Sequence, residues 1–183
     1  MNNQKNIIKL SVLGDEQAQR SLYDLYRTKW YMMAMRYGKN KTQAEDIFQE
    51  GLIQIFKDLH QFDESKAAFG TWSTQVLVHA AIRYLKKYNW IDTLTEMEEA
   101  LFIESNEENI YDKLAAKELT DMVQNLPLGY RLVFNMYALE GYKHREIAEK
   151  LGITEGTSKS QFSKAKRELQ KQLELQLTNS NHE

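Results

Sequence analysis

Short hydroxyl and cationic side chains recur along residues 159–171. On an α-helix, with its roughly 100° per residue, they share one face, with two further polar residues on its shoulders. The face holds Ser160, Ser163, Lys164, Arg167 and Lys171, with Lys159 and Gln161 on the shoulders. Hydroxyls near the N-terminal end and cations further along suit close approach to a nucleic-acid groove and its phosphates. A generic, solvated basic helix is the alternative interpretation.

The residues around this face predict a helix-turn-helix. Phe162, Ala165 and Leu169 form one apolar stripe on the opposite side of the last helix. A shorter helix is expected over residues 144–151, and Gly152 is suited to stop it in the left-handed conformation. Short helix, glycine-containing turn and longer helix is the arrangement of that DNA-binding motif.

Further features of this segment support the prediction. Pro127 suits a first helical turn, Ile153 can fill the space beneath the turn, and Thr154 can cap the last helix. Lys143 and Arg145 begin the shorter helix, where such an element crosses the DNA backbone and adds salt-sensitive, sequence-independent binding.

In the first half, residues 42–59 predict an amphipathic helix with Phe48, Leu52, Ile55 and Leu59 on its buried stripe. The outward face carries Asp46, Glu50, Ile53 and Lys57. An exposed isoleucine among charges is typical of a partner-docking spot, although single exposed isoleucines are also common. Paired catalytic carboxylates are a remote third interpretation, because no His, Cys or Gly-rich loop accompanies Asp46 and Glu50.

Residues 62–90 combine aromatic and cationic side chains, which suits single-stranded nucleic acid because bases stack on rings while cations follow the backbone. We expect Trp72 to face a core and Tyr84, Lys86 and Lys87 to face solvent. His79 is expected at a DNA-facing or packing edge, since no second ligand stands at metal-site spacing from it.

Composition limits the classes of protein open to this chain. It has 183 residues, no cysteine, one proline and a net charge of −2, so disulfides, thiolate zinc sites and thiol redox chemistry are excluded. The start has no signal-peptide pattern and no apolar run reaches the length of a membrane span, which predicts a cytoplasmic protein without membrane insertion. Helix-forming residues dominate and no strand-like alternation stands out, which predicts an all-α fold.

The charge pattern divides the chain. Residues 92–112 hold eight acids and no Lys or Arg, while the segments on both sides are basic in balance. We interpret this stretch as a flexible acidic linker between two small helical domains that bind a polyanion; a simple solvated loop is the alternative. The predicted boundaries are 1–91, linker 92–112, helix-turn-helix domain 113–175 and polar tail 176–183.

Several segments together resemble the sigma-70 family of bacterial RNA polymerase initiation factors, specifically its extracytoplasmic function (ECF) group. They are LGDEQAQRSLYDLY (13–26), AEDIFQEGL (44–52), FDESKAAFGTW (62–72), IRYLKK (82–87) and LP…YRLVFNMYALEGYKHREIAEKLGITEGTSKSQFSKAKREL. Each alone is weak, but all five in order across nearly the whole chain are specific.

The resemblance implies a role for each matching position, no catalytic residue, no metal and no cofactor. Core RNA polymerase would bind Asp46, Gln49, Glu50 and Ile53. The minus-ten promoter element would meet Lys66, Phe69, His79, Arg83, Tyr84 and Lys86. The minus-thirty-five element would meet Arg145, Lys159, Ser160, Gln161, Lys164 and Arg167. Regulation by an anti-sigma factor is also implied.

Four residues depart from the family pattern. His79 stands where Asn is usual, Arg83 where Asp or Asn is common, and Lys86 where Arg is frequent, which leaves the base preference at minus ten open. Ser158 stands where many members have Val.

Two other functions stay open at this stage. An autonomous helix-turn-helix regulator would be a dimer that reads symmetric half-sites without polymerase. A helical interaction module would use Ser160 and Lys164 only for solvation. An enzyme is the most distant reading, since no nucleotide, metal or nucleophile constellation is present.

Overall fold

The computed structural model describes residues 2–88 and 116–180, and nearly all of their regular structure is α-helical. The helices are α1 (Asn2–Val12), α2 (Glu16–Tyr37), α3 (Lys41–Asp58), α4 (Phe69–Lys87), α5 (Ala116–Gln124), α6 (Leu128–Phe134), α7 (His144–Leu151) and α8 (Glu155–Ser180). A 3₁₀ turn, Leu59–Gln61, follows α3, and a π-helical turn, Asn135–Leu139, extends α6. The prediction of two helical units is confirmed, whereas the acidic linker, 92–112, lies outside the described residues.

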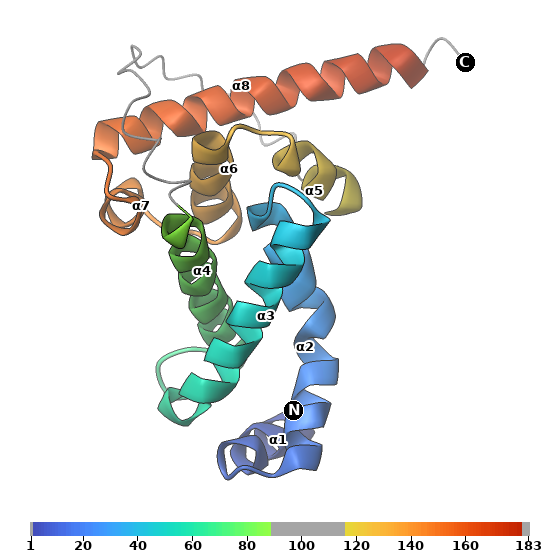
Figure 1. The fold of residues 1–183 in the computed structure, drawn as a ribbon, viewed down its shortest axis with the longest axis vertical. Coiled ribbons are helices and arrows are strands. Elements are labelled where there is room, and N and C mark those ends of the chain that lie inside the picture. The colour runs from blue at the N-terminus through green and yellow to red at the C-terminus, as the bar shows by residue number, and fades with distance from the viewer. Residues whose placement is uncertain (1, 89–115, 181–183) are drawn as a thin grey trace.

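Helices α1 to α4 form the N-terminal module, in which α2, α3 and α4 run alongside one another and α1 lies at one end (Figure 1). Side-chain caps fix where the helices begin. Asp15 Oδ1 accepts from the Ala18 N–H at 2.7 Å at the start of α2, and Asn40 Oδ1 accepts from the Gln43 N–H at 2.9 Å at the start of α3. Such caps satisfy backbone donors that have no partner within the helix.

The buried stripe of α3 differs from the expected one. Ile55 and Leu59 are buried as predicted, but the other buried residues are Gln43, Ala44, Ile47 and Gly51, while Phe48 and Leu52 are only partly buried. The helix is therefore rotated by about one residue. The reason lies at Gly51, where an added Cβ would stand 2.8 Å from Leu77 Cγ of α4, so the glycine lets the two helices approach closely.

Helices α5 to α8 form the C-terminal module and confirm the helix-turn-helix prediction. Helix α7 has the predicted bounds, and Gly152 ends it in the left-handed conformation with φ of 74°. Thr154 Oγ1 accepts from the Thr157 N–H at 3.0 Å and so caps α8. Ala165 and Leu169 are fully buried, as the stripe on the last helix requires.

The two modules pack against each other end to end, with α5 and α6 between α8 and the N-terminal bundle (Figure 1). A continuous apolar core joins them: Leu132, Val133, Met136, Ile147 and Leu151 belong to the same cluster as the core of the N-terminal module. Within the described ranges, no helix combines the length and apolar character needed to cross a bilayer.

Three polar contacts hold the two modules together at this interface, called the seam below. Arg36 Nη2 and Glu140 Oε1 form a largely buried ion pair at 3.0 Å. The Asn135 amide donates to the Arg36 carbonyl at 2.9 Å, and the Gln124 amide donates to the Met35 carbonyl at 2.7 Å. All three contacts meet the last turn of α2, so this turn anchors the C-terminal module.

Candidate nucleic-acid and polymerase interfaces

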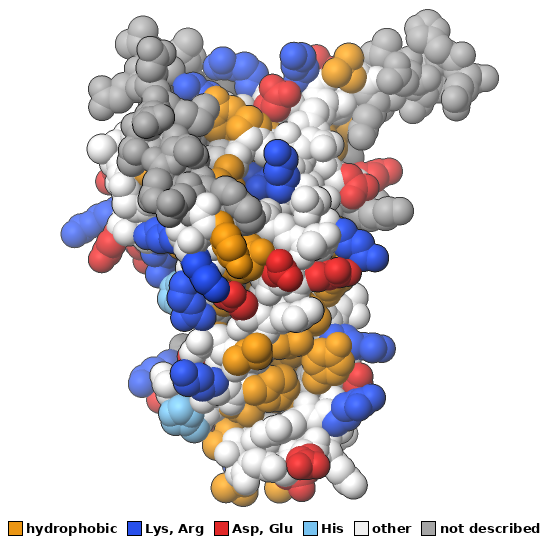
Figure 2. Space-filling view, in the orientation of Figure 1, with side chains coloured by type: hydrophobic (Ala, Val, Ile, Leu, Met, Phe, Trp, Pro, Cys, Tyr) orange, Lys and Arg blue, Asp and Glu red, His pale blue; other side chains and the backbone are white. Residues whose placement is uncertain are grey.

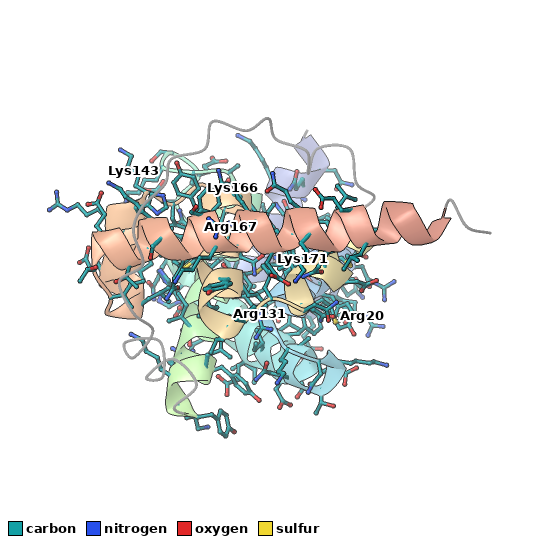
Figure 3. All side chains as sticks on the ribbon, turned by 90° about the horizontal axis from the view of Figure 1, so that it is seen from above. Arg20, Arg131, Lys143, Lys166, Arg167 and Lys171 are labelled. Atoms are coloured by element: carbon teal, nitrogen blue, oxygen red, sulfur yellow. The ribbon has the colours of Figure 1, made fainter. Side chains whose placement is uncertain are left out.

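Helix α8 crosses the top of the molecule and carries Lys166, Arg167 and Lys171 along its length (Figure 3). Arg167 is exposed, and Lys164 is half-buried. Lys159 pairs with Glu155 at 2.9 Å one turn earlier. Arg145, at the start of α7, is exposed as expected. This end of the module therefore presents several cations to solvent.

Two predicted members of the α8 face lie inside the molecule instead. Ser160 is buried and donates to the Thr157 carbonyl at 3.0 Å. Gln161 is only 2% exposed, and neither its amide nitrogen nor its amide oxygen has a hydrogen-bond partner among the described residues. Neither side chain reaches the surface in this arrangement, and their contact with DNA stays a prediction. Helix α8 contacts α5, α6 and α7, so its buried sector is wider than a single stripe.

Ser158, also on the inward side, has a polar partner. Its hydroxyl lies 2.9 Å from Nδ1 of His144, whose ring stacks on Tyr137 with centroids 4.2 Å apart. Burial, together with the nearby charge of Lys159, lowers the pKa of His144. Ser158, which stands where many family members have Val, therefore forms a hydrogen-bonded pair with His144 between α8 and α7. The sequence alone did not indicate this pair.

Phe69 and Tyr84, predicted to contact DNA, are both buried. The Phe69 ring packs against Tyr26, Phe62 and Trp72, with centroid distances of 5.0 to 5.5 Å. The Tyr84 hydroxyl donates to Asp46 Oδ2 at 2.7 Å, and burial with this carboxylate raises the pKa of Tyr84 well above its usual value. Neither ring is available for base stacking in this arrangement, so the expectation that Tyr84 faces solvent is wrong. The core position expected for Trp72 is confirmed.

The cations predicted for the minus-ten element are exposed. Lys66 pairs with Asp63 at 3.4 Å, and Arg83 donates to the Gln54 side chain at 3.1 Å. Lys86 donates to the carbonyl of Lys150 at 3.0 Å. Because Lys150 belongs to α7, the exposed Lys86 side chain reaches toward the C-terminal module.

His79 faces the same residue. Its Nε2 lies 2.7 Å from the ammonium of Lys150, a contact in which a neutral imidazole accepts the hydrogen bond. In the sequence, Lys150 is one of many cations in its segment. Its position there does not indicate that it contacts the N-terminal module.

This contact predicts a measurable titration. Burial, then the charges of Lys150 and Arg83, lower the pKa of His79 below its ordinary 6.5. Folding therefore favours the neutral ring, and stability falls as the pH drops through 6.5. We expect Lys150→Met to raise the pKa of His79, because a neighbouring positive charge is removed.

NMR titration of the imidazole carbons measures this pKa, with the His79 signals assigned by their loss in His79→Gln. Lys87→Met is the matched control, because Lys87 is an exposed cation of the same helix that does not contact the ring. A His79 pKa that stays unchanged in Lys150→Met would contradict the contact between modules.

The outward face of α3 is open as expected. Ile53 is 68% exposed, Asp46 and Gln49 are exposed, and Glu50 is half-buried. Beside it, Phe48 and Tyr31 pack edge to face with centroids 5.5 Å apart, and hydrophobic side chains gather along the seam of α2 and α3 (Figure 2). Partly exposed apolar groups beside charged ones are typical of a protein-docking surface.

Comparison with known proteins matches this architecture to one family. Residues 22–91 match the model of sigma-70 region 2, and residues 116–169 match that of sigma-70 region 4. The ECF RNA polymerase sigma factor SigW of Bacillus subtilis is 28% identical over 92% of this chain and 96% of its own length. SigM of the same organism is 26% identical over 81% of this chain and 90% of its own length.

Solved structures show the same fold. The sigma factor RpoE of Bartonella quintana, solved with the anti-sigma factor NepR, has a TM-score of 0.52 and 20% identity, over 85% of this chain and 96% of its own. CnrH, solved with the cytosolic domain of CnrY, has a TM-score of 0.50 and 16% identity, over 94% and 97% of the two chains. The protein belongs to the ECF group of the sigma-70 family of RNA polymerase sigma factors.

Proposed function

We propose that this sigma factor docks on core RNA polymerase through α3 and positions its two modules on the minus-ten and minus-thirty-five promoter elements. The observation that carries the proposal is the occurrence of sigma-70 regions 2 and 4, in order, on the two helical modules. The chemistry of RNA synthesis then belongs to the polymerase. This sigma factor is not an enzyme and acts in the cytoplasm with the polymerase.

Polymerase docking is assigned to Asp46, Gln49, Glu50 and Ile53. The exposure of Ile53 among polar neighbours supports this assignment, because such a residue can become the dry centre of an interface. Asp46 has a second role, since its carboxylate is the partner of the buried Tyr84 hydroxyl.

Promoter contacts are assigned to polar side chains that are at least partly exposed, most of them cations. Lys66, His79, Arg83 and Lys86 serve the minus-ten element, and Arg145, Lys159, Lys164 and Arg167 serve the minus-thirty-five element. His79 and Lys86 both contact Lys150 of α7, so these two residues of α4 reach DNA only after α7 moves away from α4. Free protein is therefore expected to bind DNA weakly, and polymerase or promoter must favour the open arrangement.

Regulation by an anti-sigma factor is part of the proposal. Two proteins of this fold have been solved with a second protein, and for one of them the pair is described as a sigma factor with an anti-sigma factor. A partner that prefers the closed arrangement of the modules would hold this protein inactive by the same equilibrium.

The function is tested by run-off transcription with purified core polymerase on promoter fragments of the source genome, with the RNA ends sequenced. We expect starts that require this protein and share two spaced motifs. Absence of such starts, with the core polymerase active under another sigma factor, would refute the proposal and direct attention to an autonomous DNA-binding regulator.

The promoters found in this way allow a second prediction. The double variant Lys164→Ala, Arg167→Ala is expected to lower transcript yield about thirtyfold, because two contacts to phosphates or bases at about 1 kcal/mol each sum to about 2 kcal/mol. The control is the same promoter with its upstream element scrambled. On the scrambled promoter, the double variant and the wild type should give almost the same transcript yield, because the contact between α8 and the upstream element is already absent. An equal additional loss on the scrambled promoter would contradict the role of α8.

A further inference from the structure

A cleft opens at the seam between the two modules, where the start of α3, the end of α4 and α6 meet. Its volume is about 610 Å³, which lies in the range of sites for small organic ligands. Lys39, Asn40 and Thr42 line one wall, Tyr84 and Leu85 line a second, and Leu128 and Arg131 of α6 line the third.

Arg131 is the unusual member of this lining. The side chain is only 2% exposed, yet no carboxylate among the described residues pairs with it. Its Nη1 donates to the carbonyls of Gln124 and Leu126, at 3.0 and 3.5 Å, while the buried Nε makes no hydrogen bond within the described structure. Burial alone lowers its pKa to about 10, which leaves the guanidinium charged at neutral pH. A buried charge without a counter-ion is costly unless an anion joins it.

The opposite wall is also suited to an anion. Helix α3 is eighteen residues long, and its first turn borders the cleft. The positive end of the helix dipole favours negative charge, as do the N–H groups of that turn other than that of Gln43, which the Asn40 side chain already accepts from. Lys39, exposed on the rim and in no ion pair within the described ranges, adds a mobile cation. In the view from above, Arg131 of α6 lies next to α8 (Figure 3).

We propose that this cleft binds a small phosphorylated ligand of nucleotide size, with its phosphates between Arg131 and the first turn of α3. The apolar part of the ligand would lie on Leu85 and Leu128. The carboxylate of Asp46 also lines the cleft, but it accepts from the Tyr84 hydroxyl and marks the end where phosphate does not bind. This site shares Asp46 with the polymerase contacts proposed above, and its lining contains none of the residues assigned there to promoter contacts.

Isothermal titration of the full-length protein with ADP and with pyrophosphate tests the site without reference to transcription. We expect the wild-type protein to bind ADP with a dissociation constant below about 1 mM. Lys39→Ala should weaken binding several-fold, because a charge-assisted contact is lost. Lys41→Ala, which removes the same charge two residues later on a side chain outside the cleft lining, should leave binding unchanged.

Arg131→Lys gives a second measurement that keeps the positive charge. It retains a donor for the Gln124 carbonyl but loses the planar fork, so phosphate affinity should fall about tenfold while thermal unfolding without ligand shows a folded protein. Binding of pyrophosphate as well as ADP would show that the phosphates are the recognised part.

Three results would overturn the proposal. The first is that neither ADP nor pyrophosphate gives a heat of binding in the titration. The second is that Lys39→Ala and Lys41→Ala weaken ADP binding equally. The third is displacement of ADP by a short DNA duplex at stoichiometric concentration, because the cleft would then be a contact for the DNA backbone. All three readouts are independent of whether the protein supports transcription.

Discussion

Gly38→Ala is expected to lower the free energy of unfolding by about 3 kcal/mol, the upper part of the range for overpacking a tight contact. Gly38 follows α2, and a Cβ built there would stand 2.6 Å from the backbone nitrogen and 2.8 Å from Cα of Ala44 in α3. Backbone atoms cannot rotate away as a side chain can, so α2 and α3 would have to separate. Because α2 anchors the C-terminal module, both modules should loosen.

Chemical denaturation monitored by circular dichroism measures this loss. Gly156→Ala is the matched control, because its new Cβ would have only Thr154 Oγ1 within reach, at 3.7 Å, in the first turn of α8. Alanine is favoured over glycine in a helix by up to about 1 kcal/mol, so the control should be as stable as the wild type or more stable. Equal stability of Gly38→Ala and the wild type would show that α2 and α3 do not need their close approach.

Ile53→Asp is expected to weaken binding to core RNA polymerase about a hundredfold, corresponding to the loss of a central interface residue. The side chain is exposed in the free protein, so the substitution should leave folding intact. In the complex, the new carboxylate would replace the apolar centre of the contact and add negative charge to a face that already carries Asp46 and Glu50, with Lys57 as the cation one turn away.

Affinity for core polymerase can be measured by competition with a labelled sigma factor. Leu13→Asp is the control, because Leu13 is 81% exposed and lies in the turn after α1, away from α3. Its affinity should match that of the wild type. Similar losses in both variants would point to a general effect of added negative charge and would contradict the assignment of Ile53.

Local structure was predictable where the cause is local. The stop at Gly152, the cap at Thr154 and the span of α7 depend on side chains within a few residues, and all three are confirmed. The apolar stripe of α8 was also predictable, because helical periodicity alone places Ala165 and Leu169 on one side.

The environment of the candidate site residues depends on packing between distant segments. Tyr84 is buried because Asp46, thirty-eight residues earlier, lies opposite its hydroxyl. Gln161 is buried because three helices surround the start of α8, and His79 meets Lys150 because the modules close on each other. The spacing of residues within one segment does not indicate these contacts. The sequence therefore predicted which helices form the site, but not which of their side chains are exposed.

The continuous core across the two modules gives their separation a heat-capacity signature. Opening would expose apolar side chains such as Leu132, Met136 and Ile147 to water, and exposed apolar surface raises the heat capacity. The enthalpy of opening therefore changes with temperature, and cooling weakens the apolar contribution that holds the modules together. A chain whose modules were tethered without a shared core would lack this dependence, so temperature shifts the balance between the closed and open forms of this sigma factor.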